Sequence, residues 1–128
     1  MAWTWVALDV VRAIHDRQLA EHGGLAGTRD AALVESALAR PQNLAAYGDP
    51  DAAELAAGYA YALARNHGFS DGNERTAWVV ARLFLRLNGA TLKFDPADAV
   101  ALMLGVAGGT VMEPELAAWF RERILAER

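Results

Sequence analysis

The sequence of 128 residues contains no cysteine. A disulfide scaffold, a thiolate metal site and a cysteine nucleophile are therefore excluded, and the absence fits a cytoplasmic protein. The sequence also lacks a basic run, since its net charge is -4 and its arginines are scattered among acidic residues. We therefore expect no direct binding to nucleic acid, and any phosphate ligand should be small and bound locally.

Long hydrophobic runs are missing as well. No segment approaches the roughly 20 apolar residues that a helix needs to cross a bilayer. The opening residues, MAWTWV, lack the basic flank and apolar run of a signal peptide. We therefore expect neither secretion nor membrane insertion. Apolar residues still make up 54% of the chain and charged residues 22%, which is typical of a globular protein. We expect one domain over residues 1–128.

Helical patterns cover most of the chain. Apolar spacing and capping residues predict six helices, over 8–21, 31–40, 50–66, 73–87, 96–106 and from 113 onward. The second helix should end before Pro41, because proline disfavours helical conformation in the residue before it. A loop over 42–48 should follow, with Asp49 capping the third helix and Pro50 in its first turn.

Strand patterns are confined to residues 3–6 and 91–94. Four residues each allow at most a minor two-stranded ribbon beside the helices. The expected fold class is therefore all-α, a compact bundle of about six helices. The helix over 73–87 has a wide apolar stripe and is expected to be the central one.

The most informative segment, residues 67–76, reads HGFSDGNERT. Gly72 permits a sharp turn, and the helix that begins near Asn73 offers unpaired N–H groups at the positive end of its dipole, where phosphates bind. His67 is a candidate general base near neutral pH, and Asp71 offers the hard oxygen ligands that Mg²⁺ prefers. No Walker A sequence occurs in the chain, so this helix start is the candidate nucleotide site.

This segment resembles the signature of the Fic/Doc family, H-x-F-x-D-G-N-K-R, and matches every specified position except the lysine. Similarity to the Doc branch, the toxins of the death-on-curing toxin–antitoxin pairs, extends over nearly the whole chain. The other similar segments are IHD at 14–16, GGLAG at 23–27, RD at 29–30, LVESALARP at 33–41 and LFLRLNG at 83–89.

The resemblance implies a Fic/Doc fold and an enzyme that transfers part of a nucleotide to a protein hydroxyl. In the Doc branch, the γ-phosphate of ATP, bound with Mg²⁺, passes to a threonine of elongation factor Tu and translation stops. Carried over to this chain, His67 is the general base, Asp71 holds Mg²⁺ and Phe69 anchors the loop in the core. The implied phosphate-binding residues are Gly72, Asn73, Glu74, Arg75 and Arg65.

Glu74 stands where Doc-like proteins carry a phosphate-binding lysine and Fic-like proteins a glycine. Reversing a charge about 5 Å from a phosphate changes the Coulomb energy by roughly 6 kcal/mol at an effective dielectric of about 20. Asp71 and Glu74 also have the spacing of a capping box, with Asp71 as the N-cap. In addition, a negative charge in the first turn of a helix interacts favourably with the helix dipole. Three interpretations stay open: a second carboxylate on Mg²⁺, a weakened or specialised enzyme, and an inactivating change.

The expected function is that of a Doc-type toxin. Two alternatives stay open: AMP transfer in the Fic manner, and a catalytically weakened Doc fold that serves as an antitoxin-binding module. The expected partner is a separate antitoxin whose tail folds as a helix in a groove of the toxin. The Fic inhibitory motif, (S/T)-x-x-x-E-(G/N), is absent, so we do not expect regulation within the chain.

Other conspicuous side chains favour structural roles. His15 and His22 lack a second metal ligand at helical spacing, so surface or packing roles are expected. The four tryptophans should lie in the core or at its edge. Arg82 and Arg86 are expected on a solvated face, and the loop over 41–49 is the candidate for target docking.

Overall fold

The structure is a computed structural model, and it describes residues 2–126. These residues form six helices and a two-stranded antiparallel ribbon, which confirms the predicted all-α fold. The elements are α1 (Leu8–His22), α2 (Ala31–Tyr47), α3 (Ala52–Asn66), α4 (Asn73–Leu87), β1 (Ala90–Leu92), α5 (Pro96–Gly108), α6 (Glu113–Arg123) and β2 (Ile124–Ala126). No helix within residues 2–126 is long and apolar enough to cross a membrane.

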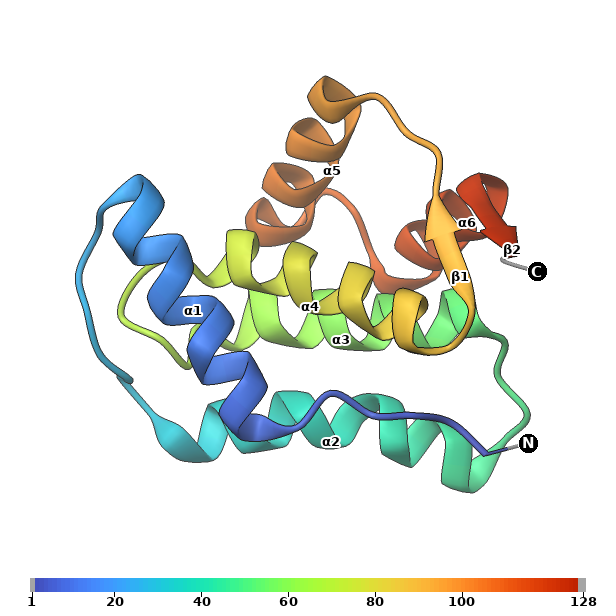
Figure 1. Cartoon of the computed structure of the whole chain (residues 1–128), viewed down its shortest axis with the longest axis horizontal. Coiled ribbons are helices and arrows are strands. Elements are labelled where there is room, and N and C mark those ends of the chain that lie inside the picture. Colours follow the sequence, from blue (N-terminus) through green and yellow to red (C-terminus); the bar gives the residue numbers. More distant parts are fainter. Residues whose placement is uncertain (1, 127–128) are drawn as a thin grey trace.

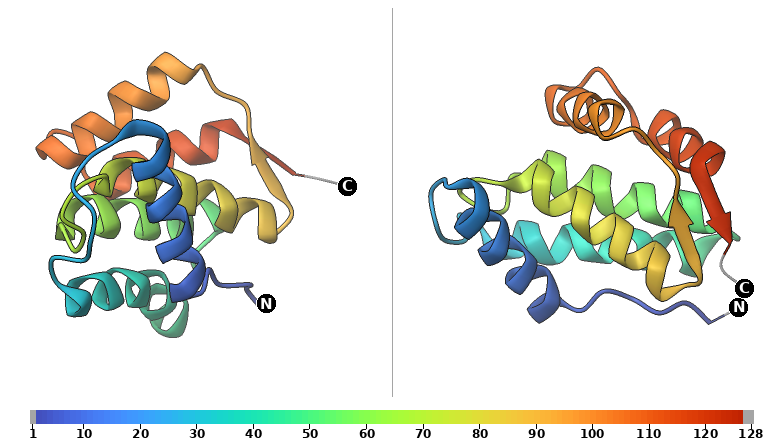
Figure 2. Two further views of the ribbon diagram at one scale, coloured as in Figure 1. Left: turned by 60° about the vertical axis from the view of Figure 1, so that its left-hand side comes forward. Right: turned by 45° about the horizontal axis from the view of Figure 1, so that its top comes forward.

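The helix α3 lies at the centre of the bundle, with α2 on one side and α5 and α6 on the other (Figures 1 and 2). Next to it lies α4, which is crossed by α1. The prediction that residues 73–87 form the central helix is wrong. Alanine makes α3 apolar on nearly every face and lets its neighbours approach closely, whereas α4 is apolar on one side only.

The second helix does not end before Pro41 as predicted. Instead, α2 continues to Tyr47 with Pro41 inside it, so most of the predicted loop over 42–48 is helical. A proline inside a helix removes one backbone hydrogen bond and costs about 3 kcal/mol. Here Pro41 is fully buried and lies against Gly58 of α3. Burial against a neighbouring helix, which sequence pattern does not reveal, offsets that cost.

The third helix begins at Ala52, and Asp51 rather than Asp49 is its N-cap. A carboxylate oxygen of Asp51 accepts from Glu54 N at 2.8 Å, and Glu54 Oε1 accepts from Asp51 N at 3.4 Å. This reciprocal pair satisfies two N–H groups at the helix start, which explains why the helix begins here. Arg121 donates to Asp51 Oδ2 at 2.7 Å and so ties α6 to the start of α3.

The ribbon consists of β1 and β2, with Thr91 opposite Leu125. The predicted strand at 3–6 is wrong, since these residues form no strand. Their backbone bonds to side chains instead: the Asn88 amide group accepts from Thr4 N and donates to Thr4 O, both at 2.9 Å. The ribbon partner of residues 90–92 comes from the far end of the chain, which local patterns could not indicate.

The four tryptophans lie at the edge of the core, as the sequence predicts. The tryptophans are half-buried and pack against the core; they are Trp3, Trp5, Trp78 and Trp119. Ring centroids of Trp3 and Trp5 lie 6.0 and 5.8 Å from that of Phe84. The extended residues 3–6 therefore cover one end of the core with aromatic rings.

Candidate active site

The connection between α3 and α4 holds the motif. His67 caps the C-terminus of α3 in the left-handed conformation, with φ 51° and ψ 43°. Such backbone is uncommon outside glycine and turns the chain sharply out of the helix. The His67 side chain is exposed and has no hydrogen-bond partner among residues 2–126. It is therefore accessible to a substrate hydroxyl, as a general base must be.

Gly68 is the point at which the motif meets the start of α2. Its carbonyl oxygen accepts from Arg29 N and Asp30 N, both at 2.9 Å. A Cβ atom at Gly68 would lie 2.5 Å from Val34 Cγ2 and 2.9 Å from Val34 N. A larger residue cannot be placed there without moving the first turn of α2.

Residues 24–30 run alongside the motif loop and hold it by backbone contacts. Thr28 and Phe69 form an antiparallel bridge, and Ser70 N donates to Gly27 O at 3.2 Å. The sequence shows this segment as similar to the Doc branch but does not assign it a role. The structure shows that this segment supports the motif loop through backbone contacts. The glycines at 23, 24 and 27 were the only local feature of the sequence that indicated a special backbone conformation there.

Phe69 and Asn73 close the loop from inside. Phe69 is 2% exposed, consistent with the expected core anchor. Asn73 Oδ1 accepts from Phe69 N, and Asn73 Nδ2 donates to Phe69 O, both at 3.1 Å. Both polar groups of this buried side chain are thus used within the loop, whereas the prediction assigned Asn73 to phosphate. Its side chain shapes the site, and its backbone N–H remains for an anion.

Asp71 is exposed, and each of its carboxylate oxygens accepts one backbone hydrogen bond. Oδ1 accepts from Gly72 N at 2.8 Å and Oδ2 from Leu25 N at 3.3 Å. The capping box of Asp71 with Glu74 is wrong. The N-cap of α4 is Gly72 itself, at φ 73°, and no side chain caps this helix. Asp71 therefore keeps lone pairs for a cation while it joins two loops.

The start of α4 presents unpaired donors. The first backbone bond of this helix runs from Thr76 N to Gly72 O at 3.0 Å, so three N–H groups before it have no acceptor within residues 2–126. They belong to Asn73, Glu74 and Arg75. The Arg75 guanidinium is exposed beside them and makes no ion pair with a described residue. This geometry suits a phosphate group.

The Arg65 side chain contacts α5. Its guanidinium donates to Val106 O at 3.4 Å, near the C-terminus of α5, and lies 5.8 Å from the ring centroid of Tyr61. A cation at this position suits the negative end of the α5 dipole. The structure therefore shows Arg65 in a contact between α3 and α5, and its phosphate contact stays a prediction.

His15 is a site residue that sequence reasoning missed. The expected packing role is correct, because His15 is 2% exposed. Its ring stacks on Phe69 with centroids 3.8 Å apart and an angle of 10°, and its Nε2 lies 2.8 Å from Asp71 O. The available signal was the IHD segment, whose similarity to the family indicated importance without a contact.

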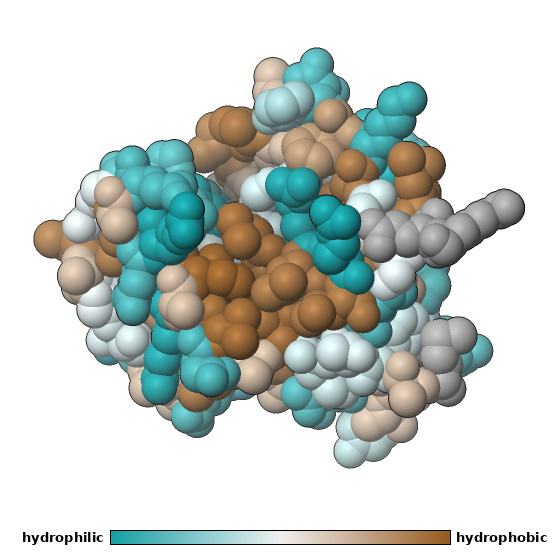
Figure 3. Space-filling model, viewed as in Figure 1, coloured by the Kyte–Doolittle hydropathy of each residue, from teal (hydrophilic) through white to brown (hydrophobic). Residues whose placement is uncertain are grey.

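A cavity of about 560 Å³ begins at the start of α4 and extends between α4 and α5, with His22 at the end of α1. Hydrophobic residues gather over α4 on this face (Figure 3). Apolar side chains dominate the lining, among them Val79, Val100, Met103 and Leu104. The two exposed ones, Val100 and Leu104, are 62% and 59% exposed. The cavity therefore opens as an apolar groove that is continuous with the motif.

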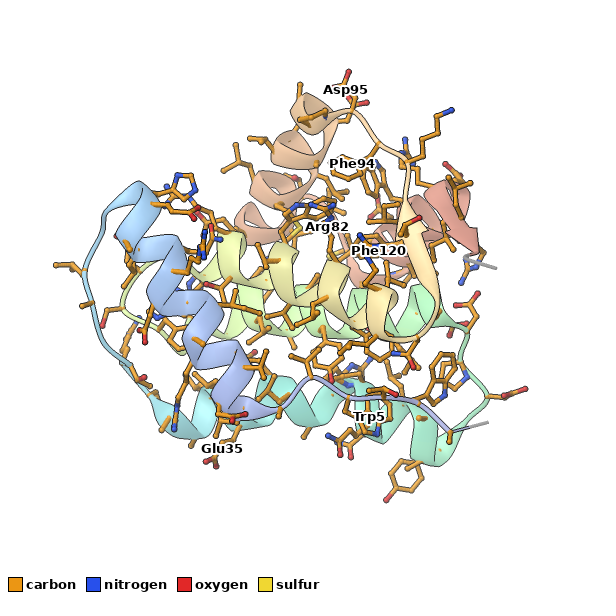
Figure 4. The ribbon with its side chains drawn as sticks, viewed as in Figure 1. Trp5, Glu35, Arg82, Phe94, Asp95 and Phe120 are labelled. Atoms are coloured by element: carbon orange, nitrogen blue, oxygen red, sulfur yellow. The ribbon has the colours of Figure 1, made fainter. Side chains whose placement is uncertain are left out.

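Arg82 lies in this groove rather than on a plain solvated face. It points from α4 towards Phe94 (Figure 4), whose ring centroid is 5.0 Å from its guanidinium carbon. The ring of Trp78 is 5.8 Å away on the same side of α4. Cation–π contacts hold the side chain in place and leave its charge without an acidic partner among residues 2–126.

Comparison with known proteins identifies relatives of this chain. Residues 5–85 match the Fic/DOC family, a stretch that includes the whole motif. The chain is 38% identical over 110 residues to the protein kinase doc of Escherichia phage P1, covering 85% of this chain and 86% of that protein. It is 44% identical over 90 residues to the toxin Doc of Mycolicibacterium smegmatis, covering 66% of this chain and 68% of that protein. The chain belongs to the Fic/DOC family.

Proposed function

We propose that the protein is a Doc-type toxin that transfers the γ-phosphate of ATP to a threonine of a translation factor, with elongation factor Tu as the target. The observation that carries this proposal is the start of α4, where unpaired N–H groups and Arg75 lie one short loop away from the exposed His67. The likeness to two Doc proteins, one of them named a protein kinase, supports it.

In the proposed reaction, the threonine oxygen forms a bond to the γ-phosphorus, and the bond from that phosphorus to the bridging oxygen breaks to leave ADP. His67 accepts the threonine proton. The N–H groups of residues 73–75 and the Arg75 guanidinium stabilise the negative charge on the phosphate oxygens. Asn73 and Phe69 keep these donors in place through their paired hydrogen bonds.

The residues present fit a magnesium ion that arrives with ATP. Among residues 2–126, no group of three or more His, Cys, Asp or Glu side chains could hold a metal alone. Mg²⁺ in nucleotide sites commonly takes only one or two protein carboxylates and fills its other positions with phosphates and water. Asp71 would supply that carboxylate, and bound Mg²⁺ would neutralise phosphate charge.

Glu74 makes the site less favourable for ATP than a lysine would. It lies in the first turn of α4, half-buried at the mouth of the cavity, without an ion-pair partner among residues 2–126. We expect Glu74→Lys to bind Mg-ATP at least about tenfold more tightly. A tenfold change in affinity corresponds to about 1.4 kcal/mol, a small part of the Coulomb energy that the charge reversal changes. Calorimetric titration of both proteins measures this, with Glu74→Gln expected between them. Equal or weaker binding by the lysine variant would contradict it.

The proposed regulator is an antitoxin segment that folds as an amphipathic helix in the groove between α4 and α5. A helix there would bury Val100 and Leu104 and run beside the phosphate-binding start of α4. Glu74 and Arg82 lie eight residues apart on α4, about 12 Å along the helix, with opposite charges and no ionic partner within residues 2–126. The groove therefore suits a helix with a basic group near Glu74 and an acidic group near Arg82.

Co-expression with the proposed antitoxin tests whether the groove is its binding site. Leu104→Asp should keep its toxicity and lose neutralisation, because a carboxylate would be buried under the partner helix. Val10→Asp is the matched control, since Val10 is 39% exposed on α1 and does not line the groove. If the antitoxin still neutralised the Leu104→Asp variant fully, its binding site would not be the groove between α4 and α5.

A second candidate is favoured by Glu74 alone: a Doc fold whose catalysis is lost and which serves as an antitoxin-binding module. Induced expression in a bacterium distinguishes the two. The first function predicts growth arrest that disappears with His67→Ala. Harmless expression of the natural protein, with arrest restored by Glu74→Lys, would favour the second. Harmless expression of both would contradict the proposed toxin.

A further inference from the structure

His15 of α1 contacts the inner side of the motif loop. His15 is 2% exposed, whereas its neighbours Asp16 and Arg17 face solvent. Its ring lies nearly parallel to that of Phe69, with centroids 3.8 Å apart, and its Nε2 is 2.8 Å from Asp71 O. We propose that His15 is a positioning residue, which fixes the turn at Asp71 and Gly72 and thereby aims the N–H groups of α4.

The carbonyl group of Asp71, which His15 contacts, accepts no backbone hydrogen bond from α4. The first backbone acceptor used by α4 is Gly72 O, one residue later. Asp71 O therefore depends on a side-chain donor, and His15 Nε2 is the partner that the structure gives it. Without this donor, the carbonyl could rotate and carry with it the peptide that links Asp71 to Gly72.

The hydrogen bond determines which nitrogen of His15 carries a proton. A carbonyl oxygen only accepts, so Nε2 must be protonated. The nearest acid to Nδ1 is the exposed Asp16 carboxylate at 4.0 Å, which is beyond hydrogen-bond distance. The bond therefore requires Nε2–H and does not require a proton on Nδ1.

The His15 ring makes both a stacking contact and a hydrogen bond with the motif loop. The Phe69 ring stacks on one face of the imidazole, and the Phe69 backbone is itself held by two hydrogen bonds with the Asn73 side chain. A Cβ built at Gly72 would lie 3.5 Å from Leu19 Cδ2 and 3.8 Å from His15 Cδ2, so the imidazole and Leu19 pack together behind the turn. A flat ring with a donor at its far end serves both contacts, which neither phenylalanine nor an amide side chain does alone.

Two substitutions separate these contacts. His15→Phe keeps a ring for Phe69 and removes the donor, and His15→Gln keeps a donor of similar reach and removes the ring. Arg12→Gln is the control on the same helix, because Arg12 is exposed and makes no ion pair with a described residue. Circular dichroism and thermal unfolding establish that each variant is folded.

The first readout needs no ligand. Amide hydrogen exchange, followed by NMR in the full chain, should be at least about tenfold faster at Gly72 and Ser70 in His15→Phe, with core amides of α4 unchanged and partial recovery in His15→Gln. Long-range proton–nitrogen spectra should show the wild-type ring protonated at Nε2, and the sequence has only three histidines to assign. Equal acceleration throughout α4, unchanged exchange at Gly72, or a proton on Nδ1 alone would overturn the proposal.

The second readout rests on the proposed function. Mg-ATP should bind His15→Phe at least about tenfold more weakly than wild type or Arg12→Gln, with partial recovery in His15→Gln. Wild-type affinity in His15→Phe would overturn the positioning role. If the wild-type protein itself does not bind Mg-ATP, the proposed function fails, and exchange at Gly72 still decides the role of His15.

Discussion

The Asn73 side chain binds both the N–H and the C=O group of the Phe69 backbone. Its Oδ1 accepts from Phe69 N and its Nδ2 donates to Phe69 O, each at 3.1 Å. A side chain on the first residue of α4 thereby takes the place of a strand partner and closes the loop over residues 69–73. The loop holds its shape through this pair on one side and His15 on the other.

Asn73→Ala should therefore destabilise the protein by about 1–3 kcal/mol, because it leaves buried backbone groups of Phe69 without partners. Urea unfolding measures the change. The control is Asn43→Ala, since Asn43 is exposed on α2 and has no side-chain bond to a described residue. Stability equal to that of the control would show that the loop does not depend on Asn73.

The sequence predicts the motif residues and their chemistry better than their contacts. The helix start, Gly72 and the burial of Phe69 follow from local patterns, because a helix N-terminus and a turn glycine have defined local geometry. The partners of Asn73 and His15 do not, since a polar side chain near an anion site could face either the ligand or the loop. Long-range packing decides between them.

The same distinction applies to the fold. Helix identity was predictable, whereas the passage of α2 through Pro41 depends on burial against α3. The ribbon partner of β1 comes from residues 124–126, and residues 3–6 bond to side chains instead. Each error arises where a contact between distant segments outweighs local preference.

Gly68→Ala should disturb the junction of the motif with α2. The new Cβ would meet Val34 Cγ2 at 2.5 Å and Val34 N at 2.9 Å, and the backbone atom cannot turn away. We expect a loss of about 1–3 kcal/mol in the free energy of unfolding. Removing the Val34 side chain should restore only part of it, because the clash with Val34 N stays.

Gly108→Ala is the matched control for this substitution. Gly108 is in the last turn of α5, and a Cβ there would meet no atom within 4 Å. Alanine should be neutral or stabilise by up to about 1 kcal/mol, since glycine is a poor helix residue. Comparable losses in both variants would mean that the close approach at Gly68 is not the cause.

Thr76→Val should stabilise the protein. The Thr76 side chain is fully buried in the core face of α4, and its Oγ1 has no hydrogen-bond partner among residues 2–126. A buried hydroxyl without a partner costs free energy that a methyl group of similar size does not, so we expect a gain of about 1 kcal/mol. Thermal unfolding tests this expectation; a lower midpoint for the valine variant would refute it.

The contact between Asp51 and Arg121 should make stability depend on pH. Arg121 donates to the Asp51 carboxylate at 2.7 Å, and this bond holds the pKa of Asp51 below its usual value. A lowered folded-state pKa means that the stabilisation is present above the unfolded pKa of about 3.9 and is lost as pH falls through the folded pKa.

Arg121→Gln should therefore lower stability at pH 7 by no more than about 1 kcal/mol, because the pair is at the surface. The difference from wild type should disappear in acid as Asp51 becomes protonated. Urea unfolding from pH 7 to about pH 2.5 follows it. A difference that stays constant over this range, or one that Arg12→Gln shows equally, would assign the effect to something other than the Asp51 charge.

In the proposed function, the loop between α3 and α4 binds ATP and transfers its γ-phosphoryl group to a threonine of a translation factor. Mass spectrometry of elongation factor Tu, incubated with the purified protein, ATP and Mg²⁺, tests it most directly. We expect the added mass of one phosphate on a threonine, its absence with His67→Ala and a larger yield with Glu74→Lys. An added AMP, or an unmodified factor with both the natural protein and Glu74→Lys, would contradict it.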